Sequence, residues 1–568
     1  MSNNSLDLQQ LRHSAAHLVG HAVSELFPGT LLTIGPATEN GFFYDCLPTR
    51  SIKEEDLVAI TMRMNELVKK NIPLTHRLIS RTEAENLFAN NKFKLELLKD
   101  IPDDAIGLAE QGDFYDLCRG GHVHSTGQLA HFKLTTISGS YWRADKSRDV
   151  LQRISGIVFW TAEELAEYER IQEERLKFDH RRIGKQLDLF SFHEEGIGFP
   201  FFHPHGKRVI NALTSHMRTI HRLHGYEEVS TPTMLSDELW KQSGHYAHYR
   251  QNMYFCEIDE QSYAVKPMNC PGAILIYKTR PRSYRELPLR LAEFGHVHRH
   301  ELSGVLHGLM RVRAFTQDDA HIFCMPSQIE QEIRTILSLI EATLTKAGFG
   351  KPAIAVSTKP ESAMGSDALW DQATNALTSA LDSLEMPYTI KPGEGAFYGP
   401  KIEIVIKDSM NREWQCGTIQ VDFFQPENFD IQYVASSGER ERPVIIHQAI
   451  FGSLERFLAI LLEHHKGTLP FWLAPVQTRI LTITDACAEY AEGIKQKLIH
   501  AGIRAEYTPS SDPISGQIKT AQGDRIPWMI VVGSKEVAAE TVTLRTLDGK
   551  QEFGLSVATL IERAASLN

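Results

Sequence analysis

Three segments with different hydrophobic patterns follow one another along this sequence. Residues 1–160 combine a helical opening with short β-type segments punctuated by turns, as in an α+β domain. Residues 184–469 alternate helical stretches with β-rich segments such as KIEIVIKD and TIQVDFF, which predicts a mostly antiparallel sheet flanked by helices. Residues 470–568 read as a small α/β domain. Because single cores stop growing at about 250–300 residues, we predict a multidomain α+β protein.

The stretch TAEELAEYERIQEERLKFDHRR separates the first two segments. It carries charged residues with apolar residues at helical spacing and few helix breakers. We interpret it as a connecting helix and place a linker at residues 161–183.

Composition and charge exclude several classes of protein. No apolar run approaches the roughly 18 residues that a membrane span needs, and the start MSNNSLDLQQ lacks the features of a secretory signal. We therefore expect a soluble, cytoplasmic protein. Seven scattered cysteines suggest buried thiols, metal ligands or nucleophiles rather than a disulfide framework. A net charge of −11 argues against indiscriminate binding of nucleic acid but leaves room for a local basic face.

Cations suited to binding a triphosphate occur in the middle segment. LRLAEFGHVHRHELSGVLHGLMRVRAFTQDDAHIF places Arg299 and Glu301 on one expected strand and Arg311 before the next. IIHQAIFGSLERFLAILLE places Gly452 and Arg456 at a strand-to-helix junction, where a glycine lets a nucleotide approach the backbone. Fixed cations stabilise the charge that develops as pyrophosphate leaves. Each arginine alone is more often a solvated salt-bridge partner.

In order and spacing, these segments resemble the signature motifs of class II aminoacyl-tRNA synthetases. The first motif is HRLHGYEEVSTPTML, with Pro232 where a helix passes into a strand. The resemblance implies that Arg299 contacts the α-phosphate of ATP, Glu301 the adenine amino group and Arg456 the γ-phosphate. It also implies Mg²⁺ on the phosphates, with Glu403 as a candidate ligand.

The amino-acid pocket resembles that of threonyl-tRNA synthetases. KPMNCPG, FTQDDAHIF, GEGAFYGPKIE, QCGTIQVDF and IIHQAI match that family almost continuously. Within them Cys270, His321 and His447 occupy the positions of a catalytic zinc, although their separations of 51 and 126 residues form no readable metal motif. The resemblance also implies a pocket for threonine, in which Asp319 holds the ammonium group. The side chains that line this pocket are Gln317, Tyr398, Lys401 and Gln420.

Selection of threonine follows from a zinc with three protein ligands and open positions for the amino and hydroxyl groups. Valine lacks the hydroxyl and is strongly rejected by such a polar site. Serine lacks only a methyl group, worth about 1–3 kcal/mol, so we expect a separate correction step.

Two pairs of side chains in the first segment have the same spacing. His13 and His17 in LRHSAAHLVGH share one helix face, and Cys118 and His122 repeat the spacing in DLCRGGH. From chemistry alone, two interpretations stay open. These groups hold a structural zinc, or they position a water against an ester.

Together with GPATENGFFYD, these pairs resemble the editing domain shared by threonyl- and alanyl-tRNA synthetases. In the threonine branch this pocket hydrolyses seryl-tRNA without a metal, and we adopt that interpretation. The editing residues implied are His13, His17, Lys94, Asp116, Cys118 and His122.

The last segment resembles the anticodon-binding domain of class IIa synthetases. Glu536 and Arg545 match positions that read anticodon bases, and Arg525 matches a supporting contact. The stretch YTPSSDPISGQIKTAQ departs from the family, because relatives carry an Arg- and Lys-rich run there. His300 and Leu302 replace the Asn and Pro expected beside Glu301. We also expect that the ubiquitin-like domain found ahead of the editing domain in many bacterial relatives is absent.

The leading hypothesis is a homodimeric, zinc-dependent enzyme that uses ATP to join L-threonine to tRNA(Thr) and edits seryl-tRNA(Thr). The first motif forms the dimer interface throughout the class. One alternative is a paralogue that acts as an RNA-binding regulator or a spare copy. Another is a class IIa relative that charges proline or serine. The expected domains are editing (1–160), catalytic (184–469) and anticodon-binding (470–568), with the linker between the first two.

Overall fold

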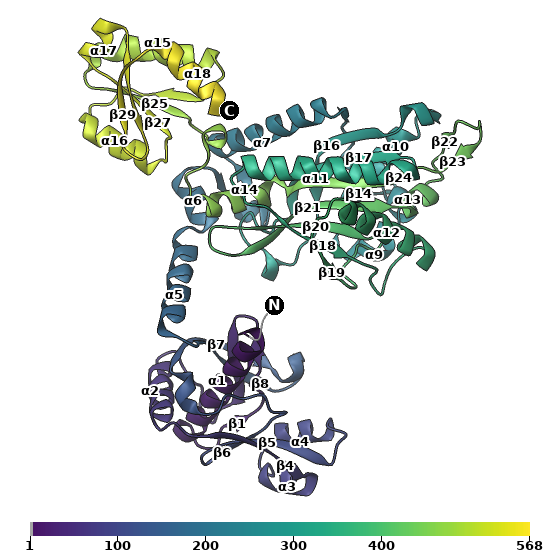
Figure 1. Ribbon diagram of the computed structural model, residues 1–568, viewed down its shortest axis with the longest axis vertical. Helices are drawn as coiled ribbons and strands as arrows, with labels where there is room; N and C mark the ends of the chain where they lie inside the picture. Colours follow the sequence, from purple (N-terminus) through teal and green to yellow (C-terminus); the bar gives the residue numbers. More distant parts are fainter. Residues whose placement is uncertain (1–3, 568) are drawn as a thin grey trace. The chain divides into compact units, whose positions relative to one another are not determined.

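The computed structural model describes residues 4–567 and divides into two compact units, Met1–Glu173 and Glu174–Asn568 (Figure 1). Each unit contains both helices and antiparallel strands, which confirms the predicted multidomain α+β class. Within residues 4–567, every helix is too short or too polar to cross a membrane.

The first unit packs helix α1 (Asn4–Leu26) against a five-stranded sheet. Apolar residues recur on one side of α1, and Leu11, Leu18 and Ala22 are buried against strand and helix residues. The strands of this sheet are β1 (Leu31–Leu32), β2 (Ala37–Thr38), β3 (Gly41–Leu47), β7 (His131–Tyr141) and β8 (Val150–Phe159). Helix α2 (Asp56–Lys69) packs against α1.

A second, three-stranded sheet completes this unit. It has the order β4-β5-β6, and all pairs are antiparallel. Its elements are β4 (Leu74–Ser80), β5 (Ala105–Gln111), β6 (Phe114–Leu117), α3 (Arg81–Leu87) and α4 (Lys92–Lys99).

The charged connecting stretch forms two helices instead of the one expected. Helix α5 (Ala162–Lys177) buries none of its residues, and α6 (His180–Gln186) begins after a break. The break follows from Asp179, whose Oδ1 accepts a hydrogen bond from the Arg181 N–H at 2.8 Å and caps α6. Ile183 of α6 and Leu187 just after it then join the core of the second unit.

An eight-stranded sheet forms the centre of the second unit (Figure 1). Only the outer pairs β11–β16 and β18–β19 are parallel, so the expected mostly antiparallel sheet is confirmed. In spatial order the strands are β11 (Tyr226–Glu228), β16 (Leu289–His298), β17 (Ala314–Cys324), β24 (Val444–Ser453), β21 (Glu413–Asp422), β20 (Lys401–Lys407), β18 (Ala353–Ser357) and β19 (Thr389–Lys391).

One face of this sheet is covered by helices and forms the largest core. Alternate strand residues such as Ile322, Ile446 and Ile402 join it. The helices that pack there are α7 (Pro204–Leu223), α11 (Ile329–Lys346), α12 (Asp367–Ser383) and α14 (Leu454–His464). Since side chains alternate along a strand, the residues between these core positions point to the other face.

Shorter elements complete the region around the sheet. They include two three-stranded sheets and a two-stranded sheet. These elements are β9 (Phe190–Ser191), β10 (Phe201–Phe202), β12 (Met234–Ser236), α8 (Asp237–Gln242), α9 (His245–Tyr249), β13 (Tyr254–Ile258), β14 (Gln261–Val265), α10 (Cys270–Tyr277), β15 (Arg282–Ser283), α13 (Phe424–Asn428), β22 (Tyr433–Val434) and β23 (Arg440–Glu441).

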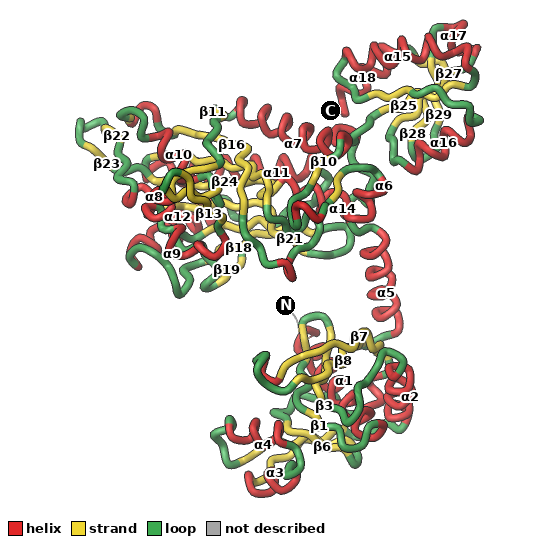
Figure 2. The backbone as a smooth tube through the Cα atoms, turned by 180° about the vertical axis from the view of Figure 1, so that it is seen from behind, coloured by secondary structure: helices red, strands yellow, loops and turns green. Residues whose placement is uncertain are grey.

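The end of the chain folds as a five-stranded sheet between helices (Figure 2). Ile480 and Ile530 face the core with α15 and α18, while Leu481 and Met529 face α16. The elements are β25 (Thr478–Thr482), α15 (Ala488–His500), β26 (Ala505–Tyr507), α16 (Ile514–Gly523), β27 (Trp528–Val532), α17 (Ser534–Ala539), β28 (Val542–Thr546), β29 (Gln551–Leu555) and α18 (Val557–Leu567).

A buried ion pair joins the segment after β14 to the central sheet, and it supplies a test of the fold. Lys266 is 2% exposed, and its Nζ donates to Glu293 Oε1 at 2.9 Å and to Thr231 Oγ1 at 2.8 Å. We expect Lys266→Met to lower the free energy of unfolding by about 3–5 kcal/mol, because it leaves the Glu293 carboxylate buried and unpaired. Urea denaturation measures this loss. The double variant Lys266→Met/Glu293→Leu should be less destabilised than Lys266→Met, because it leaves no buried charge. A double variant that is less stable than Lys266→Met would show that the unpaired carboxylate is not the cause.

Candidate functional site

The face of the central sheet opposite the largest core carries a continuous row of polar side chains across four strands. His321 on β17 pairs with His447 on β24, His447 pairs with Gln420 on β21, and Gln420 pairs with Lys401 on β20. The neighbouring row runs from Asp319 to Ala449. The register of the sheet thus brings together side chains that are remote in the sequence. His321 and His447, for example, are 126 residues apart.

Cys270, His321 and His447 meet at one end of this row. Cys270 opens α10, all three side chains are buried, and one ligand atom from each lies within 4.8 Å of the others. Burial alone would raise the pKa of Cys270, but hydrogen bonds with His321 and His447 lower it to about 7. A thiol with a lowered pKa reaches the thiolate form that binds metals.

Two further features fit a metal ion. His321 Nε2 is buried and has no hydrogen-bonding partner among the described residues. His447 Nε2 lies 2.9 Å from Asp422 Oδ2, a carboxylate–histidine contact of the kind that orients metal-bound imidazoles. Burial would lower the pKa of His447, but the hydrogen bonds to Asp422 and Cys270 outweigh it and raise the pKa to about 10. One thiolate and two imidazoles suit zinc with open coordination positions.

The other residues expected in the amino-acid pocket lie on the same face. Asp319 Oδ2 accepts a hydrogen bond from Asn269 Nδ2 at 3.0 Å. Gln420 Nε2 donates to the Gly399 carbonyl at 2.9 Å, and the Tyr398 ring lies 5.4 Å from the His447 ring. These contacts place an anion, an amide and a phenol around the Cys270, His321 and His447 cluster.

A cavity of about 300 Å³ adjoins this pocket. It brings together all the arginines expected at the triphosphate, and Gln317 is among the residues that line it. The residues that line it include Arg299, Glu301, Met310, Arg311, Phe315, Gln317, Gly452 and Arg456. Strand β16 ends at His298, so Arg299 and Glu301 lie just after the strand on which they were expected.

The cations of this cavity are held by neighbouring groups. Arg311 Nε donates to Glu301 Oε2 at 3.0 Å. Arg299 lies over the Phe315 ring at 4.9 Å, and Arg456 lies near the Trp414 ring at 5.7 Å. Arg456 Nε is buried without a hydrogen-bonding partner among the described residues, which leaves it free for an anionic ligand.

The glycine at the strand-to-helix junction has a specific role. Gly452 has φ of 81°, and a Cβ there would lie 2.6 Å from the Cys416 carbonyl oxygen. Asp318 fixes this segment by accepting hydrogen bonds at 2.8–2.9 Å from the N–H groups of Ile450, Phe451 and Gly452. The backbone therefore turns beside the cavity with little room for any other residue.

Glu403 does not line the cavity described above. Its carboxylate makes ion pairs with Lys401 at 2.7 Å and with Lys391 at 2.9 Å. Both oxygens are engaged, and this geometry does not favour Glu403 as a magnesium ligand.

The first unit holds the second cluster. His13 and His17 of α1 meet Cys118 and His122, and one ligand atom from each lies within 4.8 Å of the others. Cys118 Sγ lies 3.0 Å from His122 Nε2, and Ser14 Oγ lies 3.2 Å from His122 Nδ1.

A charged pair lies beside this cluster. Asp116 forms an ion pair with Lys94 and accepts a hydrogen bond from the Tyr44 hydroxyl, and His17 Nδ1 lies 3.9 Å away. Asp116 and Lys94 are both buried. The six residues expected in the editing pocket are therefore close together.

The electrostatics of this cluster keep its members uncharged near neutral pH. Burial, with the adjacent imidazoles of His17 and His13, lowers the pKa of His122 to about 2. Burial also lowers the pKa values of His13 and His17 and raises the pKa of Cys118 to about 11. Cys118 is thus a poor nucleophile here, because the thiolate is the reactive form.

The residues expected to read the anticodon lie on different elements of the last sheet domain. Glu536 in α17 accepts hydrogen bonds from the Gly533 N–H at 3.0 Å and from Thr543 Oγ1 at 2.9 Å. Arg545 lies on β28, and Arg525 follows α16 with φ of 56°. Arg525 lines a hollow of about 130 Å³ with Lys177, Arg182 and Lys466, which gives a basic surface.

Sequence reasoning missed three polar residues at these sites: Asn269, Asp422 and Tyr44. Asp422 shares a strand face with Gln420 two residues before it, so strand alternation was a usable signal. Asn269 and Tyr44 carried no such signal, because only the fold brings them to Asp319 and Asp116.

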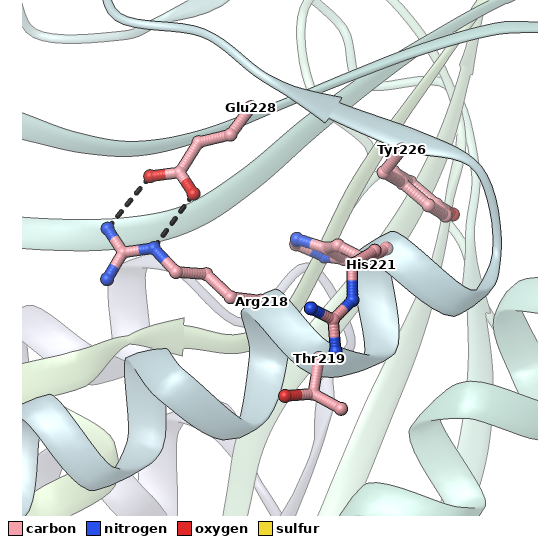
Figure 3. Close-up of a pocket in the computed structure, with 6 residues that line it drawn as sticks. Arg218, Thr219, His221, Tyr226 and Glu228 are labelled. Carbon is pink, nitrogen blue, oxygen red and sulfur yellow. Dashed lines mark hydrogen bonds and ion pairs between the residues drawn. The ribbon is translucent and has the colours of Figure 1, made fainter.

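Another hollow, of about 270 Å³, lies beside α7 and β11 (Figure 3). Its Arg218 and Glu228 neutralise each other through two hydrogen bonds of 2.8 Å. Burial lowers the pKa of His221 to about 4, so this histidine stays neutral. The remaining residues that line it are Thr219, Arg222 and Tyr226. This hollow overlaps the segment HRLHGYEEVSTPTML, and its one carboxylate is already paired with Arg218.

Comparison with known families finds a match within each of the three sequence segments. Residues 254–465 match the tRNA synthetase class II core domain (G, H, P, S and T). Residues 473–567 match an anticodon binding domain, and residues 106–155 match the threonyl and alanyl tRNA synthetase second additional domain. The antiparallel sheet with its arginine-lined cavity is therefore that of a class II aminoacyl-tRNA synthetase.

Comparison with individual proteins shows which member of this class the chain resembles. The threonine–tRNA ligase of Carboxydothermus hydrogenoformans is 51% identical over 94% of this chain and 84% of the relative. The threonine–tRNA ligase of Fusobacterium nucleatum is 49% identical over 96% of this chain and 88% of the relative. A solved structure is also similar: the crystal structure of the RNA binding domain of threonyl-tRNA synthetase from Cryptosporidium parvum, with a TM-score of 0.67 and 42% sequence identity. The match covers 69% of this chain and 98% of the chain in that crystal structure. The chain belongs to the threonyl-tRNA synthetase family.

The two clusters can be distinguished by metal analysis. If only the Cys270 cluster binds zinc, the purified protein should contain about one zinc per chain. Cys270→Ala should then lower the zinc content close to zero, whereas Cys118→Ala should leave it unchanged. Elemental analysis of the dialysed proteins measures both. Two zinc ions in the wild type, with one lost in each variant, would make the first unit a metal site as well.

Proposed function

We propose that this chain joins L-threonine to the 3′ end of tRNA(Thr) with ATP and hydrolyses seryl-tRNA(Thr) formed in error. The observation that carries this proposal is the row His321–His447–Gln420–Lys401 beside a cavity of about 300 Å³ lined by arginines. A metal-type cluster next to a phosphate-type cavity suits the activation of an amino acid. The arginines of the cavity and the cluster of Cys270, His321 and His447 are all in place, which argues against the alternative of an RNA-binding regulator that has lost catalysis.

In the activation step, the carboxylate of threonine attacks the α-phosphorus of ATP, and the bond to the bridging oxygen of pyrophosphate breaks. Arg299 and Arg456, with Arg311 beside Glu301, stabilise the negative charge that grows on the phosphates. Lys401 lies at the end of the row next to Gln420, where its ammonium group pairs with Glu403. Mg²⁺ accompanies ATP. In the second step a hydroxyl group of the terminal ribose attacks the carbonyl carbon of threonyl-adenylate, and AMP leaves.

Recognition of threonine uses the buried end of the site. Asp319 accepts the ammonium group, with its carboxylate oriented by Asn269. Cys270, His321 and His447 would hold zinc, which when bound supplies coordination positions for the amino and hydroxyl groups. Gln317, Tyr398 and Gln420 close the pocket around the side chain.

Editing takes place in the first unit. His13, His17 and His122 are neutral and able to orient a water molecule through hydrogen bonds, while Cys118 stays a thiol. This protonation state favours direct attack of water on the ester bond over a thioester intermediate. The Lys94–Asp116 pair then places a fixed cation and anion beside the 3′ end of the tRNA.

The remaining assignments concern domains, assembly and location. We assign residues 1–160 to editing, 184–469 to catalysis and 470–568 to the anticodon, where Arg525, Glu536 and Arg545 contact bases. The protein acts as a homodimer through α7 and β11. We place it in the cytoplasm, since all seven cysteines are free thiols.

Exchange of labelled pyrophosphate into ATP tests the activation step. Threonine and serine should both support exchange, and valine should not, because valine lacks the hydroxyl group that the polar site requires. Arg456→Ala should lower threonine-dependent exchange by roughly 100-fold. A wild-type protein that contains zinc but shows no exchange with any of the three amino acids would overturn the proposed activity.

Deacylation of seryl-tRNA(Thr) tests the editing assignment. His13→Ala and His122→Ala should slow hydrolysis roughly 100-fold, because a misplaced water can cost about that much, and leave threonine-dependent exchange unchanged. His124 is exposed and lies two residues from His122, so His124→Ala is the matched control and should behave as wild type. Equal loss in the control variant would show that the first unit is damaged as a whole rather than at the cluster.

A further inference from the structure

A buried histidine outside the substrate pocket links three separate segments of the second unit. His180 at the start of α6 is 0% exposed. Its Nδ1 lies 2.6 Å from Glu463 Oε1, and Glu463 Oε1 also accepts a hydrogen bond from the His180 N–H at 3.0 Å. On the other side of the ring, Nε2 accepts a hydrogen bond from the Leu309 N–H at 3.0 Å.

This arrangement fixes the protons on the ring. Because Nε2 accepts from a backbone N–H, the proton lies on Nδ1 and is donated to the Glu463 carboxylate. Asp179, His180 and Glu463 also lie within metal-binding distance of one another. Both nitrogens of His180 are engaged, however, and Glu463 Oε2 forms an ion pair with Arg412. The cluster is therefore a hydrogen-bonded bridge rather than a metal site.

One end of the bridge reaches the arginine-lined cavity through a loop. Leu309 lies between β16 and β17, lines that cavity, and is followed by Met310 and Arg311. A shift of Leu309 would carry Arg311 and its partner Glu301 with it, since they lie in the same loop.

The other end reaches the opposite wall. Glu463 lies in α14, the helix that also carries Arg456. Arg412, the ion-pair partner of Glu463, lies over the Trp414 ring at 5.1 Å, and Arg456 lies near the same ring at 5.7 Å. The bridge thus connects the two walls of the cavity from behind.

We propose that His180 is a positioning residue for ATP. It holds the loop with Leu309 and Arg311 at a fixed distance from α14 with Arg456, so that the cations of both walls meet the triphosphate together. The inference rests on the proposed role of the cavity as the ATP site. It predicts that losing the bridge weakens ATP binding without altering the pocket for threonine, which lies on the strand face around Cys270.

The loop itself shows how closely it packs on His180. Gly308 has φ of 48°, and a Cβ there would lie 2.2 Å from His180 Nε2. Gly308→Ala therefore disturbs the same contact from the side of the loop and leaves His180 intact. Gly304 lies in the same loop, and a Cβ there would meet no atom of the described residues within 4 Å, so Gly304→Ala is a matched control.

The test measures ATP and threonine separately on the full-length, zinc-loaded protein. We expect His180→Leu and Gly308→Ala each to raise the Kd for ATP, measured by calorimetry without threonine, about tenfold. Each should also lower kcat for pyrophosphate exchange about tenfold. A displacement of a positioning group by about 1 Å can lower a rate roughly 100-fold, so a smaller displacement accounts for this loss. The KM for threonine and the zinc content should stay within about twofold of wild type. Gly304→Ala should match wild type.

The double variant decides between positioning and general damage. If both substitutions break one bridge, the double variant His180→Leu/Gly308→Ala should bind ATP little more weakly than either single variant. The reason is that the effects of substitutions within one network of contacts do not add up. An unchanged Kd for ATP in the single variants, or parallel increases for ATP and threonine, would overturn the inference. If His180→Leu does not fold, Gly308→Ala alone decides. A wild type that binds ATP without exchange refutes the proposed ligase activity, while the Kd for ATP still tests His180.

Discussion

The pairing register of β17, β24, β21 and β20 is the constraint on which the catalytic site depends. It sets His321 opposite His447 and Gln420 opposite Lys401, while the alternate residues of each strand enter the core. A shift of one residue in any of these pairs would exchange the two faces. The apolar packing of Ile322 and Ile446 under α11 and α14 therefore also fixes the polar row on the other side.

Charge is handled in opposite ways at the two clusters. In the second unit, partners for Cys270 and His447 favour their charged forms, and the pKa of Cys270 falls to about 7. In the first unit burial outweighs the contacts of Cys118 with its neighbouring histidines, and the pKa of Cys118 rises to about 11. Two sites built from cysteine and histidine thus differ in charge because of their surroundings: one favours a thiolate paired with an imidazolium, and the other favours neutral groups.

The arginine-lined cavity depends on parts of the chain that do not touch its interior. Asp318 and Gly452 shape the turn into α14, and the capping hydroxyl of Ser453 lies 3.2 Å from the Arg456 N–H. Behind the opposite wall, His180 connects the loop of Leu309 to Glu463. Flexible cations become useful for phosphate chemistry only when such contacts remove their freedom, because preorganised charges stabilise the transition state without further rearrangement.

The sequence by itself determined the class of fold, the order of the domains and the family, because hydrophobic period and motif order are local properties. It also indicated the helix face shared by His13 and His17 and the junction at Gly452. It could not show the contacts of Tyr44 with Asp116 or of His180 with Leu309, nor the break that divides α5 from α6. Those were decided by tertiary structure alone, since they depend on backbone positions brought together by packing between segments remote in sequence. The same holds for the Cys270, His321 and His447 cluster: the sequence matched its members to a family, but only strand register and the start of α10 bring their ligand atoms within 4.8 Å.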